Sequence, residues 1–413
     1  MGEIIVRLRQ LNFINRFRQL IPDKVVNYLY HLPLAFLAVL YYRYPASNLK
    51  VIGVTGTDGK TTTATLIFNI LKKAGFKTAL ISTVSAKIGK RDLATGFHVT
   101  SPDPWELQRL LRLISDQDFD FLVLESTSHG LDQFRLLGCN FKIGVITNVT
   151  HEHLDYHKTW ENYLKAKAKL FGRTEYSILN KDDRSFQRLR RLASGKIITY
   201  GFKKADLTPK KFPFKTSLPG DFNQYNLLAA VAAAKILEID DQVIRQAIAE
   251  FKGVVGRMDE VKMGQNFRAF IDFAHTPNGL KNSLKTLKSF KPRKLIAVFG
   301  AAGLRDRTKR PMMGKIACFW ADKVILTAED PRTEDVNQII EQIASGCKIK
   351  SKIIRESDRR KAINLGILMA KKGDIVGIFG KGHEKSLCFD TKEYPWSEHE
   401  VVKKALKGRL KNV

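Results

Sequence analysis

The sequence predicts an α/β protein with two domains, each built on a mainly parallel β-sheet, behind a short helical N-terminal segment. Short apolar runs of strand length alternate with longer helical patterns from about residue 49 onward. This alternation pauses in a helical region that ends at the glycine-bounded stretch 253–256, and it then starts again. Strand–helix alternation is typical of parallel sheets, because each crossover between parallel strands needs a connecting helix.

The chain has 413 residues, 44% of them hydrophobic, which is enough to bury the cores of two or three domains. We expect a basic amphipathic helical segment at 1–48, a central domain at 49–255 and a Rossmann-like α/β domain at 256–413. The stretch 253–256, Gly-Val-Val-Gly, is predicted to be the hinge between the two domains.

The individual elements follow from apolar runs and helical periodicity. In the central domain, strands are predicted at 51–54, 78–83, 119–125 and 143–148. Helices are predicted at 62–74, 104–115, 160–171, 226–237 and 242–251. In the second domain, strands are predicted at 269–272, 294–299, 323–327 and 375–379, with helices between them.

Lysine and arginine outnumber the acidic residues by 70 to 41, which gives a net charge of +29. This excess suits a nucleotide, a nucleic acid or an anionic membrane as partner, and a solvated basic surface explains it equally well. The charge is spread along the chain, and no nucleic-acid-binding module is recognisable, so no nucleic acid is expected.

The four cysteines, Cys139, Cys318, Cys347 and Cys388, lie far apart and form no CxxC pair. We therefore expect neither a disulfide framework nor a cysteine zinc site, and a reducing cytoplasm fits this composition. A monomer in the cytoplasm is the expectation.

Residues 1–48 are predicted to form two short basic helices, the second ending in an apolar run at 32–42. That run is about half the length needed to span a bilayer, so a transmembrane helix is not expected. The segment could lie on the inner face of the membrane, contact another protein, or pack on the next domain. Basic residues precede the apolar run at Arg7, Arg9, Arg16, Arg18 and Lys24.

A nucleotide site is predicted where the first strand of the central domain meets the following helix. Glycines let the backbone wrap phosphate oxygens, the helix N-terminus supplies donors, and a lysine adds positive charge. Val54 stands where the eight-residue Walker pattern has glycine, so the match to that pattern is partial. The loop residues are Gly56, Thr57, Asp58, Gly59, Lys60, Thr61 and Thr62.

Two further polar motifs follow predicted strands, and strand ends on this side of a parallel sheet are where ligands bind. Glu125 begins one motif and His153 lies in the other, so both could complete a magnesium site beside Thr61. Histidine is an uncommon ligand for magnesium, which leaves a zinc site open as an alternative. That alternative would use His151, His153 and His157.

Taken together, the motifs resemble the Mur ligase family, and within it the muramyl-tripeptide synthetases of the MurE type. The resemblance runs from about residue 49 to the C-terminus, and several specific motifs occur in the family's order. They are Gly-Thr-Asp-Gly-Lys-Thr-Thr at 56–62, Thr-Ser-Pro at 100–102, the run 125–131, His-Leu-Asp-Tyr-His at 153–157, Phe-Asn-Gln-Tyr-Asn at 222–226, Gly-Arg-Met at 256–258, Asp-Phe-Ala-His-Thr-Pro at 272–277 and Gly-Lys-Gly-His-Glu at 380–384.

The resemblance implies a P-loop-type central ATPase domain and an ATP-dependent ligase with magnesium as cofactor. A substrate carboxylate attacks the γ-phosphate of ATP, and the amine of an amino acid then attacks the resulting acyl phosphate. The phosphate loop and the magnesium ions would neutralise charge on the transferred group, and the resemblance assigns these roles to Lys60, Thr61, Glu125 and His153. Lys167 matches the family's carbamylated lysine, which would hold a second magnesium ion.

The same matching implies the remaining ligand contacts. On the nucleotide side they are Asn226, Arg257, Asp272 and His275. On the muramyl-peptide side they are Thr100, Ser101, Ser128, Gln133 and Arg135. For the incoming amino acid they are Arg305, Glu329, Asp330, Arg332, Gly380 and Glu384.

The stretch 329–332 bears on the choice of amino acid. Diaminopimelate-adding members carry Asp-Asn-Pro-Arg there, and this chain has Glu-Asp-Pro-Arg. Arg332 can hold a distal carboxylate in a bidentate manner, which favours meso-diaminopimelate. The additional carboxylate of Asp330 would also suit the ammonium group of L-lysine, so lysine stays open.

The chain departs from the family in three places, one of which is a shortened stretch at 199–220 that lacks strands relatives usually carry. The separate domain that grips the uridine diphosphate in relatives has no counterpart, so a lipid-linked or otherwise modified muramyl acceptor is an alternative. Asp58 stands where relatives usually have asparagine and puts a negative charge beside the phosphates, for which the sequence offers no reason. The competing functions are another Mur-scaffold amide ligase, resembling a folylpolyglutamate or cyanophycin synthetase, and a nucleotide-dependent nucleic-acid-binding protein.

Overall fold

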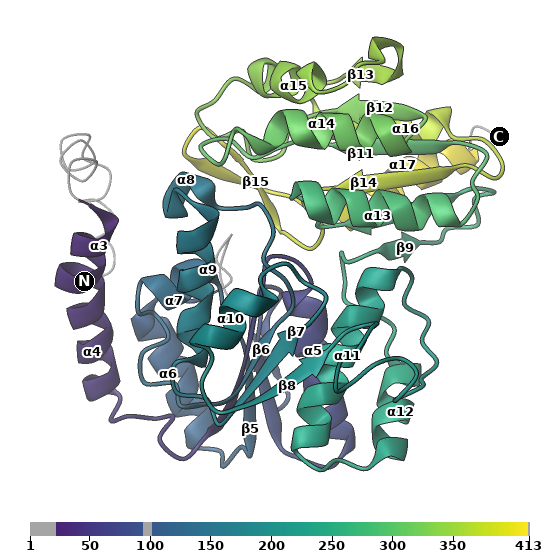
Figure 1. Cartoon of the computed structure of the whole chain (residues 1–413). Helices are drawn as coiled ribbons and strands as arrows, with labels where there is room; N and C mark the ends of the chain where they lie inside the picture. Colours follow the sequence, from purple (N-terminus) through teal and green to yellow (C-terminus); the bar gives the residue numbers. More distant parts are fainter. Residues whose placement is uncertain (1–21, 94–100, 412–413) are drawn as a thin grey trace.

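The computed structural model describes residues 22–93 and 101–411, and it confirms the α/β fold (Figure 1). The described residues form an eight-stranded sheet, a six-stranded sheet and a two-stranded ribbon. The two large sheets belong to separate stretches of the chain, and the second lies above the first in Figure 1.

The eight-stranded sheet has the order β4-β3-β2-β5-β1-β6-β7-β8. It is parallel from β2 to β8, and β3 and β4 add an antiparallel edge. Its central strand, β1, therefore has a parallel neighbour on each side. The strands are β1 (Lys50–Thr55), β2 (Thr78–Ile81), β3 (Ala86–Ile88), β4 (Arg91–Leu93), β5 (Phe121–Glu125), β6 (Phe141–Ile146), β7 (Tyr176–Asn180) and β8 (Lys196–Tyr200).

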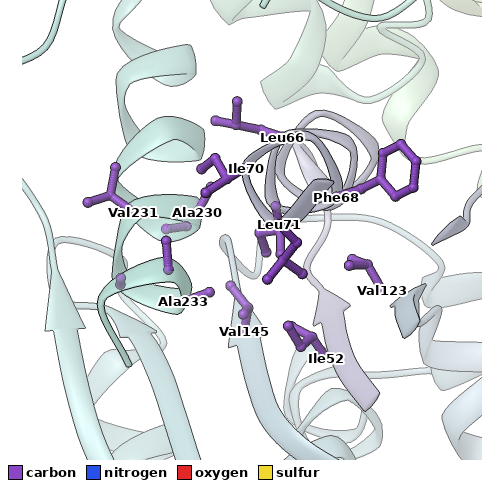
Figure 2. Packing of buried hydrophobic residues seen from close by; sticks show 14 of the residues in the cluster. Ile52, Leu66, Phe68, Ile70, Leu71, Val123, Val145, Ala230, Val231 and Ala233 are labelled. Atoms are coloured by element: carbon purple, nitrogen blue, oxygen red, sulfur yellow. The ribbon is translucent and has the colours of Figure 1, made fainter. Parts of the chain in front are cut away.

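Helices cover both faces of this sheet and bury a separate apolar cluster on each side. On one face lie α5 (Lys60–Lys73), α11 (Asp221–Ile236) and α12 (Asp241–Glu250). The alanines of α11 let it approach α5 closely, and Figure 2 shows Ala230 and Ala233 near Ile70 and Leu71. The other elements are α6 (Pro104–Ser115), α7 (Ser128–Asp132), α8 (Leu154–His157), α9 (Trp160–Ala168), η2 (Lys169–Phe171) and α10 (Phe186–Leu192).

The six-stranded sheet has the order β13-β12-β11-β14-β10-β9 and is parallel except for β9. One apolar cluster joins it to α13, α14 and α15, and a second joins it to α16 and α17. Its strands are β9 (Asp259–Val261), β10 (Arg268–Asp272), β11 (Leu295–Phe299), β12 (Lys323–Leu326), β13 (Ile353–Arg355) and β14 (Ile375–Phe379). The remaining elements are α13 (Pro277–Ser289), α14 (Lys309–Trp320), α15 (Val336–Ser345), η3 (Lys350–Lys352), α16 (Arg359–Met369), β15 (Ser386–Phe389), β16 (Lys392–Pro395) and α17 (Glu398–Lys411).

The N-terminal segment contributes one helix, formed by α3 (Asp23–Val26), the π-turn η1 (Asn27–His31) and α4 (Leu32–Tyr41). The π-turn lies just before Pro33, which has no N–H to continue the regular ladder. The first of the two predicted basic helices falls outside the described residues. The helix Asp23–Tyr41 is longer than the apolar run predicted at 32–42, and by length and composition alone its 19 residues are enough to cross a membrane. That it does not span a membrane stays a prediction.

The expectation that the cysteines stay unpaired was wrong. Cys318 in α14 and Cys347 after α15 form a disulfide, with their Cα atoms 5.7 Å apart. The 29-residue separation gives no hint of this pair, and only the packing of α14 against α15 brings the two thiols together. Cys139 and Cys388 are free.

Candidate active site

A cavity of about 800 Å³ lies between the two domains. From the central domain it is lined by the loop after β1 and by residues that follow β5 and β6. From the second domain it is lined by residues that follow β10, β11, β12 and β14. Both sheets therefore present the carboxyl ends of their strands to one cavity, which is the usual place for ligands in parallel α/β folds.

The loop between β1 and α5 has the geometry of a phosphate cradle. Gly56 and Gly59 adopt φ angles of 147° and 85°, a region that disfavours other residues. A Cβ atom on Gly56 would lie 1.8 Å from Thr147 Oγ1, and one on Gly59 would lie 2.2 Å from Asn226 Oδ1. Any side chain at either position would therefore push the loop away from its supports on β6 and α11.

Three side chains form a hydrogen-bonded chain at the start of α5. Arg257 Nη2 donates to Thr61 Oγ1 at 3.1 Å, and that hydroxyl lies 3.1–3.2 Å from both carboxylate oxygens of Glu125. Lys60 Nζ donates to the carbonyl of Thr57 at 2.9 Å, so its ammonium group folds back over the loop. Burial lowers the pKa of Lys60, although the nearby carboxylates of Glu125 and Asp58 oppose that shift.

Arg257 also has bonding capacity left for a ligand. Its guanidinium stacks 4.4 Å from the ring centroid of Phe273, and its Nε has no hydrogen-bond partner among the residues that the structure describes. A buried donor of this kind costs free energy unless a ligand satisfies it. The triphosphate of a nucleotide, held by the adjacent loop, would do so.

Lys167 is buried beneath the loop, where it is only 1% exposed. Its Nζ donates to the carbonyl of Gly56 at 2.6 Å and lies 4.3 Å from the ring centroid of Tyr163. Burial and the positive charge of Lys60 hold the pKa of Lys167 well below its usual value. Its position directly behind the phosphate loop therefore favours the neutral amine over the ammonium form.

His153 lines the cavity beside two other histidines. Its ring centroid lies 4.8 Å from that of His129, which in turn lies 5.4 Å from that of His157. Burial lowers the pKa of His153 well below its usual value and lowers that of His129 to about 3. These rings are therefore neutral, the form in which imidazole can bind a metal.

A second group of polar residues lines the cavity near α7. Arg135 donates from Nε and Nη2 to Gln133 Oε1 at 3.0 and 2.6 Å, and from Nη1 to the carbonyl of Ser101 at 3.1 Å. Ser101 Oγ is 2.9 Å from Thr127 Oγ1, the N-cap of α7. Gln133 therefore sets the orientation of the guanidinium rather than facing the cavity itself.

Two arginines line the cavity from the second domain. Arg332 Nη1 donates to the carbonyl of Gly303 at 2.6 Å. Burial and the positive charge of Arg332 lower the pKa of Arg305, and both side chains line the same cavity. Two neighbouring cations of this kind favour an anionic ligand such as a carboxylate.

Two acidic side chains lie beside these arginines and differ in their partners. Asp330 accepts from Lys381 Nζ at 2.8 and 2.9 Å and from the Cys388 amide at 2.9 Å. Glu329 is buried, and its Oε2 has no hydrogen-bond partner within the described part of the chain. Burial raises the pKa of Glu329 to about 7. The absence of a side chain at Gly380 makes room for Glu329, because a Cβ atom there would lie 2.1 Å from Oε2.

Two models of protein families match the chain. Residues 54–234 match the Mur ligase middle domain, and residues 256–382 match the Mur ligase glutamate ligase domain. Among curated proteins, a UDP-N-acetylmuramoyl-L-alanyl-D-glutamate–2,6-diaminopimelate ligase from Aquifex aeolicus (strain VF5) is 43% identical over 390 residues. That match covers 89% of this chain and 80% of the relative. The chain belongs to the Mur ligase family.

Other relatives agree with this assignment. A ligase of the same name from Clostridium botulinum (strain ATCC 19397 / Type A) is 36% identical over 91% of this Mur ligase and 81% of the relative. A solved structure of an enzyme with that name is 33% identical, with a TM-score of 0.59 over 88% of this chain and 80% of that one. Folylpolyglutamate synthase from Mycobacterium tuberculosis, complexed with ADP, shares the fold at 16% identity, with a TM-score of 0.68 over 84% and 91% of the two chains.

The structure of this Mur ligase brings most of the predicted site residues to one cavity. Gly56, Ser128, Gln133 and Lys167 do not line it, and Thr100 falls outside the described residues. The predicted residues that line it are Thr57, Asp58, Gly59, Lys60, Thr61, Thr62, Ser101, Glu125, Arg135, His153, Asn226, Arg257, Asp272, His275, Arg305, Glu329, Asp330, Arg332, Gly380 and Glu384.

The geometry does not support the alternative zinc site. His151 Nε2 lies 3.1 Å from Asp306 Oδ2 in the second domain, whereas His153 and His157 contact His129. Across residues 22–93 and 101–411, no three histidine, cysteine or acidic side chains gather in a way that could hold a metal ion.

Sequence reasoning missed a buried ion pair between the two domains of the Mur ligase. Lys309 Nζ lies 3.1 Å from Glu152 Oε1, and the two side chains are 3% and 5% exposed. Both residues line the cavity. Glu152 lies within a motif that the sequence singles out, but Lys309 sits in a basic stretch like many others in the chain, so only the fold reveals the pair.

Proposed function

We propose that this Mur ligase is an ATP-dependent amide ligase that adds a diamino acid to a muramyl-dipeptide precursor in peptidoglycan synthesis. The observation that carries the proposal is one cavity lined both by the phosphate loop and by Arg305 and Arg332. The names of the relatives, which are 2,6-diaminopimelate ligases, support the same reaction.

In this reaction an acceptor carboxylate oxygen attacks the γ-phosphorus of ATP, the bond to the bridging oxygen breaks, and ADP leaves. The amine of the diamino acid then attacks the acyl carbon, phosphate departs with the electron pair of the acyl–oxygen bond, and the nitrogen releases one proton to solvent. Lys60 and Arg257 lie where negative charge spreads over the transferred phosphoryl group. Arg135 lies where an anionic acceptor would be held.

Magnesium is part of the proposal, and the residues present fit it. Glu125 is only 1% exposed, yet both of its carboxylate oxygens point at the hydroxyl of Thr61 beside the phosphate loop. Carboxylate and hydroxyl oxygens together with substrate phosphates are the ligands that Mg²⁺ prefers. Bound there with help from neutral His153, the ion would neutralise charge on the β- and γ-phosphates.

We propose that Lys167 is carbamylated. The neutral amine can attack carbon dioxide, forming an N–C bond and losing a proton, which converts the side chain into an anion. Burial and the charge of Lys60 favour the neutral amine that this step requires. The resulting carboxylate-like group could hold a second magnesium ion behind the loop.

The contacts around the stretch 329–332 favour meso-diaminopimelate over L-lysine. Both carboxylate oxygens of Asp330 already accept hydrogen bonds from Lys381, so this side chain is engaged within the protein rather than open to a substrate ammonium group. Arg332 and Arg305 together suit the distal carboxylate that diaminopimelate has and lysine lacks.

The proposal is tested by an assay of the purified full chain with ATP and magnesium. We expect phosphate release to require both UDP-N-acetylmuramoyl-L-alanyl-D-glutamate and meso-diaminopimelate, with a tripeptide product in the mass spectrum. A lipid-linked muramyl dipeptide and L-lysine complete the panel, which separates the acceptors and the amino acids. Phosphate release that instead depends on a folate and glutamate, or on DNA or RNA, would refute the proposal.

We further propose that the enzyme is a cytoplasmic monomer that contacts the inner face of the membrane through the helix Asp23–Tyr41. The helix docks by one face, because Asn27 Nδ2 donates to Asp132 Oδ2 at 2.9 Å and to Tyr156 Oη at 3.1 Å. The opposite face is apolar and open to solvent, with Leu29 76% and Tyr41 71% exposed. Lys24 and Arg43, both exposed, lie near its two ends and complement anionic lipid headgroups.

The membrane proposal is tested by flotation with vesicles of phosphatidylglycerol and, separately, of phosphatidylcholine. We expect the full chain to float with the anionic vesicles, and Leu29→Ser/Leu37→Ser/Tyr41→Ser to lose this binding. Phe319→Ser/Leu368→Ser removes exposed apolar side chains of the second domain and should float normally. Equal flotation of all three proteins would overturn the proposal. It would also be overturned if the full chain did not float and light scattering instead showed a dimer that the triple substitution in the helix abolished.

A further inference from the structure

Asp58 lies in the phosphate loop, and its backbone is hydrogen-bonded to the central domain. Its amide donates to Asn148 Oδ1 at 3.0 Å, and its carbonyl accepts from Thr147 Oγ1 at 2.6 Å and from Asn148 Nδ2 at 3.0 Å. Thr147 and Asn148 follow β6 directly, so the loop and the end of that strand move together. The side chain, in contrast, makes its contacts with the other domain.

Both carboxylate oxygens of Asp58 accept hydrogen bonds from residues at the start of α13. Thr276 Oγ1 donates to Oδ1 at 2.9 Å, and Asn278 Nδ2 donates to Oδ2 at 2.7 Å. Thr276 is the N-cap of this 13-residue helix, and its hydroxyl also accepts from the amide of Gly279 at 2.9 Å. The negative charge therefore lies at a helix N-terminus, where the helix dipole favours it.

This arrangement accounts for an acidic residue beside bound phosphates. With the domains together, two donors and a helix N-terminus hold the carboxylate away from the loop's anionic ligand. If the domains separated, the carboxylate would lose both donors while the triphosphate remained nearby. Repulsion would then disfavour the open state of the nucleotide complex.

We propose that Asp58 is a positioning residue that couples closure of the second domain to occupancy of the phosphate loop. This inference rests on the proposed ATP-dependent function and assigns no contact between the Asp58 carboxylate and the nucleotide. Other contacts also join the two domains, including Arg257 with the loop hydroxyl of Thr61 and Lys309 with Glu152. Asp58 differs from them because it brings a negative charge from the loop itself to the second domain.

Exchanging the side chains of Asp58 and Asn278 tests whether their hydrogen bond couples the two domains. In Asp58→Asn, the amide oxygen can still accept from Thr276, and the Asn278 amide can rotate to accept, so kcat should fall by less than about fivefold. In Asn278→Asp, two carboxylates face each other across the interface, and kcat should fall on the order of 30-fold or more. The double exchange restores an amide–carboxylate pair, and its kcat should return to within about threefold of the unmodified enzyme.

The KM for ATP separates positioning from direct nucleotide binding. We expect Asn278→Asp to lower kcat much more than it changes the KM for ATP, because turnover needs the closed state whereas the phosphate loop can bind nucleotide with the domains apart. The coupling itself returns only a smaller shift to the KM, by linkage. Lys281→Gln, on the exposed side of the same helix, changes the net charge by the same amount as Asn278→Asp and should leave kcat unchanged. A double exchange as slow as Asn278→Asp, or an effect confined to the KM for ATP, would overturn the proposal.

Small-angle X-ray scattering with a non-hydrolysable ATP analogue and magnesium needs neither acceptor nor amino acid. We expect Asn278→Asp to have a larger radius of gyration than the unmodified enzyme, and the double exchange to regain the smaller one. The scattering result tests the role of Asp58 independently of the product assay. If the unmodified enzyme formed no muramyl product, that outcome would refute the proposed function but not the role of Asp58. If Asn278→Asp does not fold, Asp58→Ala and Asn278→Ala replace the exchange, and additive effects on kcat would overturn the coupling.

Discussion

Lys381 Nζ lies 2.8 Å from Oδ1 and 2.9 Å from Oδ2 of Asp330, and both side chains are buried. This ion pair joins the loop after β12 to the loop after β14, two strands that β11 separates in the sheet. Lys381 also lies 2.6 Å from Glu384, so two carboxylates at the wall of the cavity share one ammonium group. These contacts fix the shape of the amino-acid end of the site.

Removing that ammonium group should destabilise the enzyme. Lys381→Met keeps the apolar stem but leaves Asp330 charged and buried, and breaking a buried pair in this way costs about 3 kcal/mol. Chemical denaturation should report this loss in the free energy of unfolding. Lys403→Met breaks an exposed pair with Glu400 and should change the free energy of unfolding by less than about 0.5 kcal/mol. Equal effects of the two substitutions would contradict the structural role of Lys381.

Glu329 should make stability depend on pH in the neutral range. Its pKa is raised from 4.5 to about 7 by burial, so between these values the folded protein binds more protons than the unfolded chain. The contribution of protonated Glu329 to the free energy of unfolding is fully present below about pH 4.5. It is lost as the pH rises toward 7, and the total loss is about 3 kcal/mol.

Glu329→Gln isolates this effect, because glutamine keeps the shape and does not titrate. The free energy of unfolding of the unmodified enzyme, minus that of the variant, should fall steadily from pH 5 to 7 and then level off. Glu250→Gln, at an exposed carboxylate, should give a flat difference over the same range. A flat difference for Glu329→Gln would show that this carboxylate is not held in its neutral form.

Arg332→Lys should separate the two candidate amino acids. The lysine keeps the charge but cannot form the paired hydrogen bonds of a guanidinium, so the KM for meso-diaminopimelate should rise about 10- to 100-fold. Any residual activity with L-lysine should change little, since lysine has no distal carboxylate. Arg307→Lys, an exposed neighbour, serves as the control. Equal losses with both amino acids would place Arg332 elsewhere in the mechanism.

The sequence predicts the central parts of this fold because buried parallel strands and amphipathic helices leave clear patterns. The helix Pro104–Ser115 is found with its predicted bounds, and the strand–loop–helix around Gly56 is placed within a few residues. The short strands β3, β4, β9, β13, β15 and β16 are missed, since runs of three or four residues are too short to carry a periodic signal. The strands β7 and β8, each of five residues, are missed as well.

In the candidate site, too, some features could be predicted from the sequence and others could not. Residues inside motifs, such as Glu125 and Arg257, come together as expected because the motifs follow strand ends. Contacts between distant segments, such as Glu152 with Lys309, depend on how the two domains meet and leave no local pattern. The disulfide of Cys318 with Cys347 is invisible for the same reason.

Lys167 provides the most direct test of the metal site. Lys167→Ala removes the amine behind the loop, so amide ligation should fall by at least about 100-fold, the cost of losing a charged group at a phosphoryl-transfer centre. Lys165, two residues earlier in α9, is exposed, so Lys165→Ala should retain full activity.

Added short carboxylates such as acetate or propionate should partly restore Lys167→Ala, because they can enter the vacated space and supply the oxygen ligands of the carbamate. The unmodified enzyme should also show an added mass of one carbon dioxide and should lose activity on purging with carbon-dioxide-free buffer. Full activity of untreated Lys167→Ala would remove this lysine from the metal site. A dead variant that no carboxylate rescues, with unchanged binding of the ATP analogue, would instead assign Lys167 to holding the loop through its bond to Gly56.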